Sequence, residues 1–138
     1  MTEARLDDLL RRAAATHRLA IERALGDLGV TLAQYAVLKT VAETPGLSNA
    51  AIARAERLTP QTTSLVLANL ERKHAVERRD HERHGRIRRA EATELGARLL
   101  AACRERLGGH HRRLAAALPP EGGGGVEAWL SRLAEMKV

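Results

Sequence analysis

The chain has 138 residues, with 20 Arg and 3 Lys against 17 acidic residues and a formal net charge of +6. This length predicts a single domain, residues 1–138. Tyr35 and Trp129 are the only aromatic residues, too few for a β-sandwich or barrel, whereas abundant Ala, Leu, Arg and Glu favour helix. No apolar run approaches the ~20 residues that span a bilayer. We therefore expect a mainly α, cytoplasmic protein with no membrane partner.

The positive charge is concentrated in one segment. Residues 72–89 carry eight cations and three acids, a balance of +5, whereas the other 120 residues carry 15 cations and 14 acids. A local excess of this kind is typical of a surface that binds a polyanion. The alternative interpretation is a solvated charged face with no binding role.

The first half of the chain predicts two helices separated by a short loop. Apolar residues recur at helical spacing over 6–28, which predicts a long amphipathic helix ending near Gly26 or Gly29. Thr31 and Gln34 have the spacing of a capping box. The second helix should therefore run over residues 32–43, where Pro45-Gly46 stops it.

Two shorter helices should follow in quick succession. Ser48 can cap a helix that extends to Arg57, and Thr59 followed by Pro60 marks the start of a helix over residues 60–73. About two residues separate these helices, which is helix-turn-helix spacing.

The remainder predicts a hairpin and two helices. Residues 75–78 and 86–89 can each form a short strand, with residues 79–85 as the loop. Thr93 should cap a long helix that extends to about Leu118. Pro119-Pro120 and the glycines at 122–125 should then form a flexible connection before a last helix over 126–136.

The helix over 60–73 has two distinct faces. One face should pack inward and comprises Thr63, Val66, Leu67 and Leu70. The opposite face comprises Gln61, Ser64, Leu65, Ala68 and Arg72, with Asn69 at the margin. A narrow polar face fits the major groove of DNA, where glutamine can pair with adenine. Leu65 fits either a thymine methyl contact or a slightly buried contact within the lobe.

The basic hairpin complements this helix. Its arginines can neutralise phosphates, and an arginine at its tip can enter the narrow minor groove. The helix would then read sequence while the hairpin adds affinity, so binding should weaken steeply with salt.

The motifs across this region resemble those of the MarR family of winged-helix transcription regulators. They comprise Leu32–Leu38, Pro45–Ser48, Ile52–Ala53, Leu58–Ser64, Leu70–Glu71, Val76–Arg78 and Gly85–Arg86. The Thr93 and Gly96 pair resembles the motif that opens the family's long C-terminal helix. The resemblance covers residues 31–100. Many members have glycine where this chain has His74, which implies a positive φ angle at this histidine.

The resemblance implies a homodimer that binds an inverted-repeat site in double-stranded DNA. We expect a sequence-specific transcriptional repressor that a small-molecule effector releases from DNA. It assigns residues 31–93 to a winged helix-turn-helix lobe, and residues 1–30 and 94–138 to dimerisation helices. By position, Thr59, Gln61, Thr62 and Ser64 match the family's DNA-contacting helix start, and Arg86 its wing arginine. With the residues singled out above, the expected DNA contacts are Ser48, Thr59, Gln61, Thr62, Ser64, Leu65, Asn69, Arg78, Arg79, Arg83, Arg86 and Arg88.

Two further sites follow from the same resemblance. The expected dimer contacts are Leu6, Leu9, Leu10, Ala13, Leu114, Leu118, Trp129, Leu130 and Leu133. The family binds small aromatic or anionic effectors, and His17 and Tyr35 could line such a pocket. The alternative for both residues is a core or boundary position.

The other reactive side chains favour no enzyme. His81 and His84 are three residues apart, but zinc needs three or four convergent ligands, so polar wing residues fit better than a metal site. Cys103 lies on a largely apolar helix side and is interpreted as structural rather than peroxide-sensing. No catalytic constellation appears. We expect no cofactor, and the alternative function is a nucleic-acid-binding dimer without sequence preference or effector.

Overall fold

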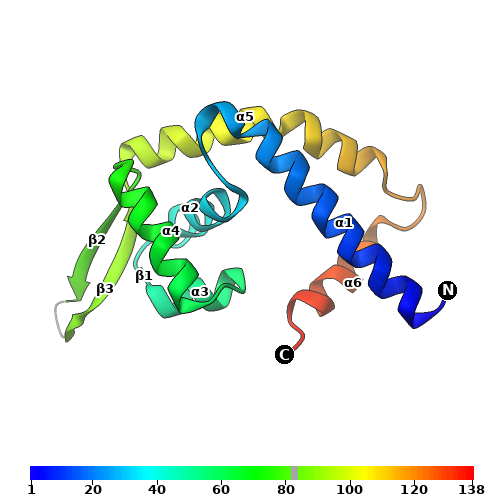
Figure 1. Ribbon diagram of the computed structural model, residues 1–138, viewed down its shortest axis with the longest axis horizontal. Helices are drawn as coiled ribbons and strands as arrows, with labels where there is room; N and C mark the ends of the chain where they lie inside the picture. Colours follow the sequence, from blue (N-terminus) through cyan, green and yellow to red (C-terminus); the bar gives the residue numbers. More distant parts are fainter. Residues whose placement is uncertain (82–83) are drawn as a thin grey trace. The chain divides into compact units, whose positions relative to one another are not determined.

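A computed structural model describes residues 1–81 and 84–138, the side chains of residues 81 and 84–87 excepted. The chain divides into two compact units, Met1–Leu107 and Gly108–Val138. The elements in chain order are α1 (Glu3–Ala24), the 3-10 turn η1 (Gly26–Leu28), α2 (Leu32–Glu43), β1 (Leu47–Ser48), α3 (Asn49–Glu56), α4 (Pro60–Arg72), β2 (Val76–His81), β3 (His84–Ala92), α5 (Glu94–Ala116) and α6 (Gly123–Ala134) (Figure 1). The mainly α winged helix-turn-helix prediction is confirmed.

Hydroxyl side chains begin five of the helices. The four predicted caps accept hydrogen bonds from the backbone three residues on: Thr31 at 3.1 Å, Ser48 at 3.2 Å, Thr59 at 3.1 Å and Thr93 at 3.0 Å. Gln34 completes the predicted capping box, because its Oε1 accepts from the Thr31 N–H at 3.3 Å. Each cap satisfies a backbone donor that the helix itself leaves unpaired.

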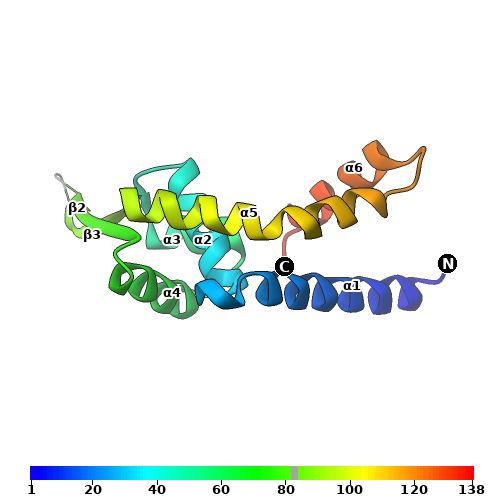
Figure 2. The same ribbon diagram turned by 90° about the horizontal axis from the view of Figure 1, so that it is seen from above.

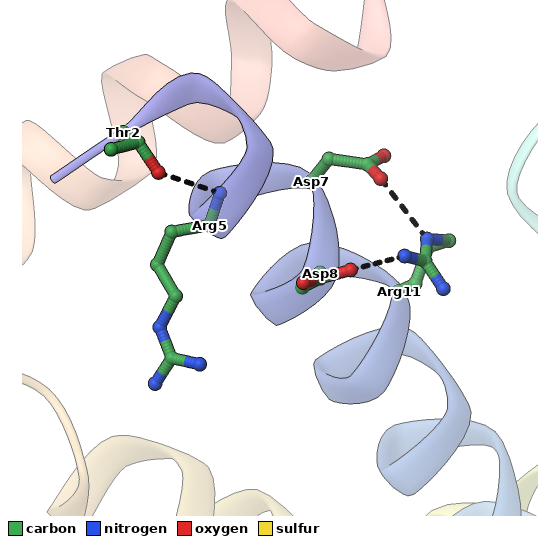
Figure 3. A network of polar contacts seen from close by, with 5 residues as sticks. All are labelled: Thr2, Arg5, Asp7, Asp8 and Arg11. Carbon is green, nitrogen blue, oxygen red and sulfur yellow. Dashed lines mark hydrogen bonds and ion pairs between the residues drawn. The ribbon is translucent and has the colours of Figure 1, made fainter.

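Helix α1 begins in the same way. The Thr2 hydroxyl accepts from the Arg5 N–H at 3.1 Å, and Arg11 pairs with Asp7 at 3.2 Å and with Asp8 (Figure 3). These ion pairs are exposed and therefore stabilise the helix only slightly.

The predicted start of α6 is wrong. The first α-helix ends at Ala24 and η1 follows it as far as the Gly29 cap, close to the predicted end, and α5 ends at Ala116, close to the predicted end at about Leu118. Helix α6, in contrast, begins at Gly123, three residues before the predicted start. Glycine disfavours helix, but the Val126 N–H donates to the Gly122 carbonyl at 2.9 Å and closes the first turn. Three glycines of the predicted connection, at positions 123–125, are therefore part of the helix, and Gly122 precedes it as the N-cap.

The strands form one antiparallel sheet in the order β1-β3-β2. Strands β2 and β3 form a ribbon beside α4 in both views (Figures 1 and 2). The loop prediction is wrong for residues 79–81 and 84–85, which lie in strands, because the ladder continues through Arg79 opposite Arg89 and Asp80 opposite Arg88. Strand β1 was not predicted, and its pairing of Leu47 with Ala90 is a long-range contact.

The core of the first unit joins its helices. Leu25, Leu38, Ile52, Leu67 and Leu107 come from or follow different helices, and each is fully buried. Full burial of such a side chain contributes about 1.5–3 kcal/mol relative to exposure. No helix in the described residues is long and apolar enough to cross a membrane.

Cys103 lies in this core as well, as the structural interpretation predicts. Burial raises the pKa of its thiol, although the charge of Lys73 acts in the opposite direction. A buried thiol with a raised pKa stays protonated at neutral pH and reacts slowly.

Polar contacts secure the turn around η1. The Lys73 ammonium, which follows α4, donates to the Gly29 carbonyl at 2.5 Å and to Gln34 Oε1 at 3.2 Å. On the α5 side, Arg106 pairs with Asp27 at 2.8 Å. The hydrogen bond and the charge of Arg106 lower the pKa of the Asp27 carboxyl. The end of α1 is thus connected to both α4 and α5.

Candidate nucleic-acid interface

Helix α4 presents a polar face to solvent. Thr63, Val66, Leu67 and Leu70 are buried, as predicted for the inward face. Gln61, Thr62, Ser64 and Leu65 are exposed on the opposite face. Leu65 is 68% exposed, so the alternative of a packing contact within the lobe is wrong. The exposed apolar side chain is available for a base contact.

Hydrogen bonds among three threonines organise the start of α4. The Thr59 hydroxyl accepts from the Thr62 N–H and donates to Thr62 Oγ1 at 3.0 Å, while the Thr63 hydroxyl donates to the Thr59 carbonyl at 2.9 Å. Pro60 occupies the first turn, where its missing N–H costs no hydrogen bond. A helix N-terminus carries partial positive charge and binds phosphate readily.

The turn between α3 and α4 sets the angle of the pair. Arg57 adopts a left-handed conformation with φ 55°, and the Leu58 N–H donates to the Ala53 carbonyl at 3.0 Å. Ser48 caps α3 and pairs with Arg89 across the sheet. Its hydroxyl therefore already has a structural role. His74 has φ 59°, which confirms the positive angle expected at this position.

Three of the wing arginines that the structure describes have carboxylate partners. Arg78 lies 2.5 Å from Glu71, and the two side chains are only 20% and 31% exposed. Arg79 lies 3.5 Å from Glu77 and 3.7 Å from Glu91. Arg88 lies 3.6 Å from Asp80 and also donates to the Arg78 carbonyl at 3.3 Å.

These pairs reduce the charge that the wing offers to DNA. Glu71 and Glu91 lie just outside residues 72–89, and when they are included, residues 71–91 carry eight cations against five acids. The predicted contact Arg83 lies outside the described residues, as does the side chain of Arg86. At the edge of α4, Arg72 donates to the predicted contact residue Asn69.

The sequence model of the MarR family matches residues 30–87. The HTH-type transcriptional repressor Rv2887 of Mycobacterium tuberculosis (strain ATCC 25618 / H37Rv) is 38% identical over 97 residues, which cover 70% of each chain. The chain belongs to the MarR family. The crystal structure of M. tuberculosis Rv2887 in complex with salicylic acid is 32% identical, with a TM-score of 0.70 over 91% of this chain and 93% of that one.

A second solved structure has a similar fold. S. aureus MepR in its DNA-binding conformation is 25% identical, and the two chains align with a TM-score of 0.81 over 93% of this chain and 95% of MepR. The sequence-based resemblance to the MarR family is thus confirmed.

The predicted effector residues of this MarR family chain differ in exposure. Tyr35 is 8% exposed and belongs to the core cluster, whereas His17 is half-buried on α1. A depression of about 400 Å³ in the first unit is lined by other residues, namely His74, Val76, Glu77, Thr93, Glu94 and Leu95.

Each unit of the MarR chain exposes apolar side chains from the predicted dimer set. On α1, Leu9 is exposed and Leu6 and Leu10 are half-buried, whereas Ala13 is exposed. In the second unit the exposed fractions are 45% for Leu114, 44% for Leu118 and 48% for Leu130, and Trp129 and Leu133 are half-buried.

Sequence reasoning missed two residues at this interface. Glu71 holds Arg78, and Asn49 donates from Nδ2 to Ser64 Oγ at 3.0 Å. Both contacts join different elements, so no local spacing could indicate them. Among the described residues, no three His, Cys, Asp or Glu side chains are grouped to hold a metal ion.

Arg78→Ala should lower the free energy of unfolding by about 1–2 kcal/mol, because the half-buried Glu71 loses its charged partner. The salt dependence of DNA binding should stay unchanged. Arg72→Ala is the matched control, since Arg72 is exposed and pairs with the neutral Asn69. Urea unfolding and DNA titrations over a salt series measure both effects. A flatter salt dependence without loss of stability in Arg78→Ala would identify Arg78 as a phosphate contact instead.

Proposed function

We propose that the protein is a sequence-specific DNA-binding transcriptional regulator, acting as a homodimeric repressor at an inverted repeat. The observation that carries this function is the exposed polar start of α4 beside the basic β2–β3 ribbon. The similarity to a named transcriptional repressor supports repression, and the similarity to MepR in its DNA-binding conformation supports the DNA-bound arrangement. The protein acts by binding, without a catalytic step or a cofactor.

The proposed contacts divide into two groups by chemistry. Gln61, Ser64 and Leu65 read base edges, because their side chains are exposed on the outward face of α4. The start of α4 at Thr59 and Thr62 contacts phosphate. Further contacts to the DNA backbone come from Asn69 at the margin of α4 and from the wing residues Arg79, Arg83, Arg86 and Arg88. On binding, the paired arginines exchange their carboxylate partners for DNA phosphates.

Dimerisation supplies the second half-site. The exposed apolar residues on α1 and, in the second unit, on α5 and α6 are proposed to pack against a second copy of the chain. A two-fold dimer places two α4 helices on one DNA duplex, and an inverted repeat has the matching symmetry.

The proposed effector is a small aromatic or anionic molecule. The related Rv2887 has been crystallised with salicylic acid, which supports this chemical class. His17 and Tyr35 remain the proposed pocket residues. Binding of such a ligand should release DNA if the ligand favours a conformation with lower DNA affinity.

Gln61→Ala should relax preference at one or two base pairs in each half-site, whereas Arg86→Ala should weaken binding to all sequences about equally. The measurement is fluorescence anisotropy with duplexes from the DNA upstream of the coding sequence, together with scrambled duplexes of equal length. Affinity should fall as salt rises, with a slope of roughly −0.9 per neutralised phosphate.

Two results would contradict the proposal in different ways. Absence of salt-sensitive binding to any inverted repeat would exclude a DNA-binding regulator. Equal affinity for specific and scrambled duplexes would instead favour the second candidate, a nucleic-acid-binding dimer without sequence preference. The basic β2–β3 ribbon is the observation that favours this second candidate. Its arginines, which pair with carboxylates in the free protein, would contact phosphates, and phosphate contacts carry no sequence information.

A further inference from the structure

Asn49 connects α3 to the proposed reading face of α4. It is the first residue of α3 and is half-buried, and its Nδ2 donates to Ser64 Oγ at 3.0 Å. Ser64 itself is exposed on α4. The contact joins residues 15 positions apart in the sequence, so it exists only because the helix-turn-helix brings α3 against α4.

The orientation of the Asn49 amide is unusual. Its Oδ1 is buried and makes no hydrogen bond within the described part of the chain. A buried carbonyl oxygen without a partner costs free energy, and such groups are rare in folded proteins. The Asn49 amide thus directs its acceptor, Oδ1, into the protein, and only its donor, Nδ2, contacts Ser64.

This orientation decides which role remains for the Ser64 hydroxyl. A serine hydroxyl has one hydrogen to donate and two lone pairs that accept. Because Asn49 donates to one lone pair, the Ser64 hydrogen does not point at Asn49 and is available to a group on the DNA. We propose that Asn49 is a positioning residue that determines base preference by setting the Ser64 hydroxyl as a donor.

The proposal rests on the proposed DNA-binding function and specifies the base edges that Ser64 recognises. In the major groove, the acceptors are guanine O6 and N7, adenine N7 and thymine O4, whereas cytosine offers an N4 donor. Ser64 should therefore favour an acceptor edge over cytosine at its position in each half-site, because only one of its lone pairs is left to accept from the cytosine N4 donor.

Asn49→Asp tests the assignment because it reverses the hydrogen bond. An ionised carboxylate has only acceptors, so the Ser64 hydroxyl would donate to the substituted side chain and present its lone pairs to the groove. Preference at the Ser64 position should shift by about tenfold toward cytosine or the N6 amino group of adenine. Affinity for every sequence should also fall, because the new negative charge lies beside the proposed reading face and is repelled by the charge of the DNA.

The measurement uses the full chain and a DNA library randomised across one half-site, with bound and free duplexes sequenced. Ser64→Ala identifies which base position Ser64 reads, because preference there should flatten. The double variant Asn49→Asp with Ser64→Ala should have the same preference profile as Ser64→Ala alone. Ala50→Asp is the matched control, since it adds the same charge at the exposed next position of α3 but should leave preference at the Ser64 position unchanged.

An unchanged preference in Asn49→Asp, or a change at a position that Ser64→Ala does not affect, would overturn the inference while leaving the DNA-binding function intact. Failure of the wild-type chain to select any sequence would instead overturn the proposed function. If Asn49→Asp does not fold by circular dichroism, Asn49→Ala decides the question. Removal of the amide frees the hydroxyl to donate or accept, so discrimination at the Ser64 position should fall at least threefold, and full retention would contradict the proposal.

Discussion

Gly96→Ala is expected to lower the free energy of unfolding by about 3 kcal/mol, near the upper end for overpacking. A Cβ at Gly96 would lie 2.0 Å from the Ala75 carbonyl oxygen and 3.0 Å from the carbonyl carbon. That carbonyl also accepts from the Thr93 N–H at 3.0 Å, and the Thr93 hydroxyl donates to the His74 carbonyl at 2.5 Å. Backbone therefore has to move, and the movement disturbs the cap that begins α5.

Thermal unfolding followed by far-ultraviolet circular dichroism should show Tm lower by roughly 10 °C for a chain of this size. Gly109→Ala is the matched control in the same helix, because the nearest atom to its Cβ is Arg112 Nη2 at 3.9 Å. This control should gain about 0.5–1 kcal/mol, since alanine favours helix over glycine. Equal Tm values for the two variants would contradict the prediction, because they would show that a Cβ at residue 96 fits beside the Ala75 carbonyl without steric cost.

Leu65→Glu is expected to reduce DNA affinity by at least about 100-fold, because a carboxylate on the reading face meets the charge of the DNA backbone. Leu65 is 68% exposed, so the free energy of unfolding should stay within about 0.5 kcal/mol of wild type. Anisotropy titrations at constant salt and urea unfolding measure the two quantities. The combination of intact folding and lost binding would place α4 at the DNA.

Two further variants isolate the cause. Leu65→Arg should strengthen binding to all sequences and make the salt dependence steeper, with about −0.9 added to the slope per new phosphate contact. Leu95→Glu places the same acid at another exposed leucine, 52% exposed at the start of α5, and should leave affinity nearly unchanged. Similar losses for Leu65→Glu and Leu95→Glu would indicate a general charge effect and would remove Leu65 from the interface.

Charge arithmetic on the sequence indicated a polyanion-binding segment, but overstated the cations that are free of partners. The count over residues 72–89 could not include Glu71 and Glu91 as partners, because ion pairing depends on which side chains face each other across strands and helices. In the structure, Arg78 is bound to Glu71 and Arg79 lies near Glu91. The positive segment remains, yet its arginines differ in their availability to DNA.

The beginnings of the capped helices were predictable from the sequence alone. Thr31, Ser48, Thr59 and Thr93 act on backbone groups only three residues away, so a short pattern contains all the information that the contact needs. The two faces of α4 were predictable for the same reason, since helical periodicity alone separates Leu67 from Ser64. Where no side chain caps the helix, at Gly122 before α6, the prediction failed.

Only the tertiary structure decided the contacts between distant segments. The pairing of β1 with β3, the Arg78 and Glu71 pair and the hydrogen bond from Asn49 to Ser64 each join different elements. The same residue types are equally common in exposed loops and on solvated helix faces, so they indicate no particular partner. The partner of a polar side chain depends on which other groups the fold places within hydrogen-bonding distance. The sequence by itself thus determined where the helices begin and which face of α4 is polar. The fold determined which polar groups on that face are already engaged.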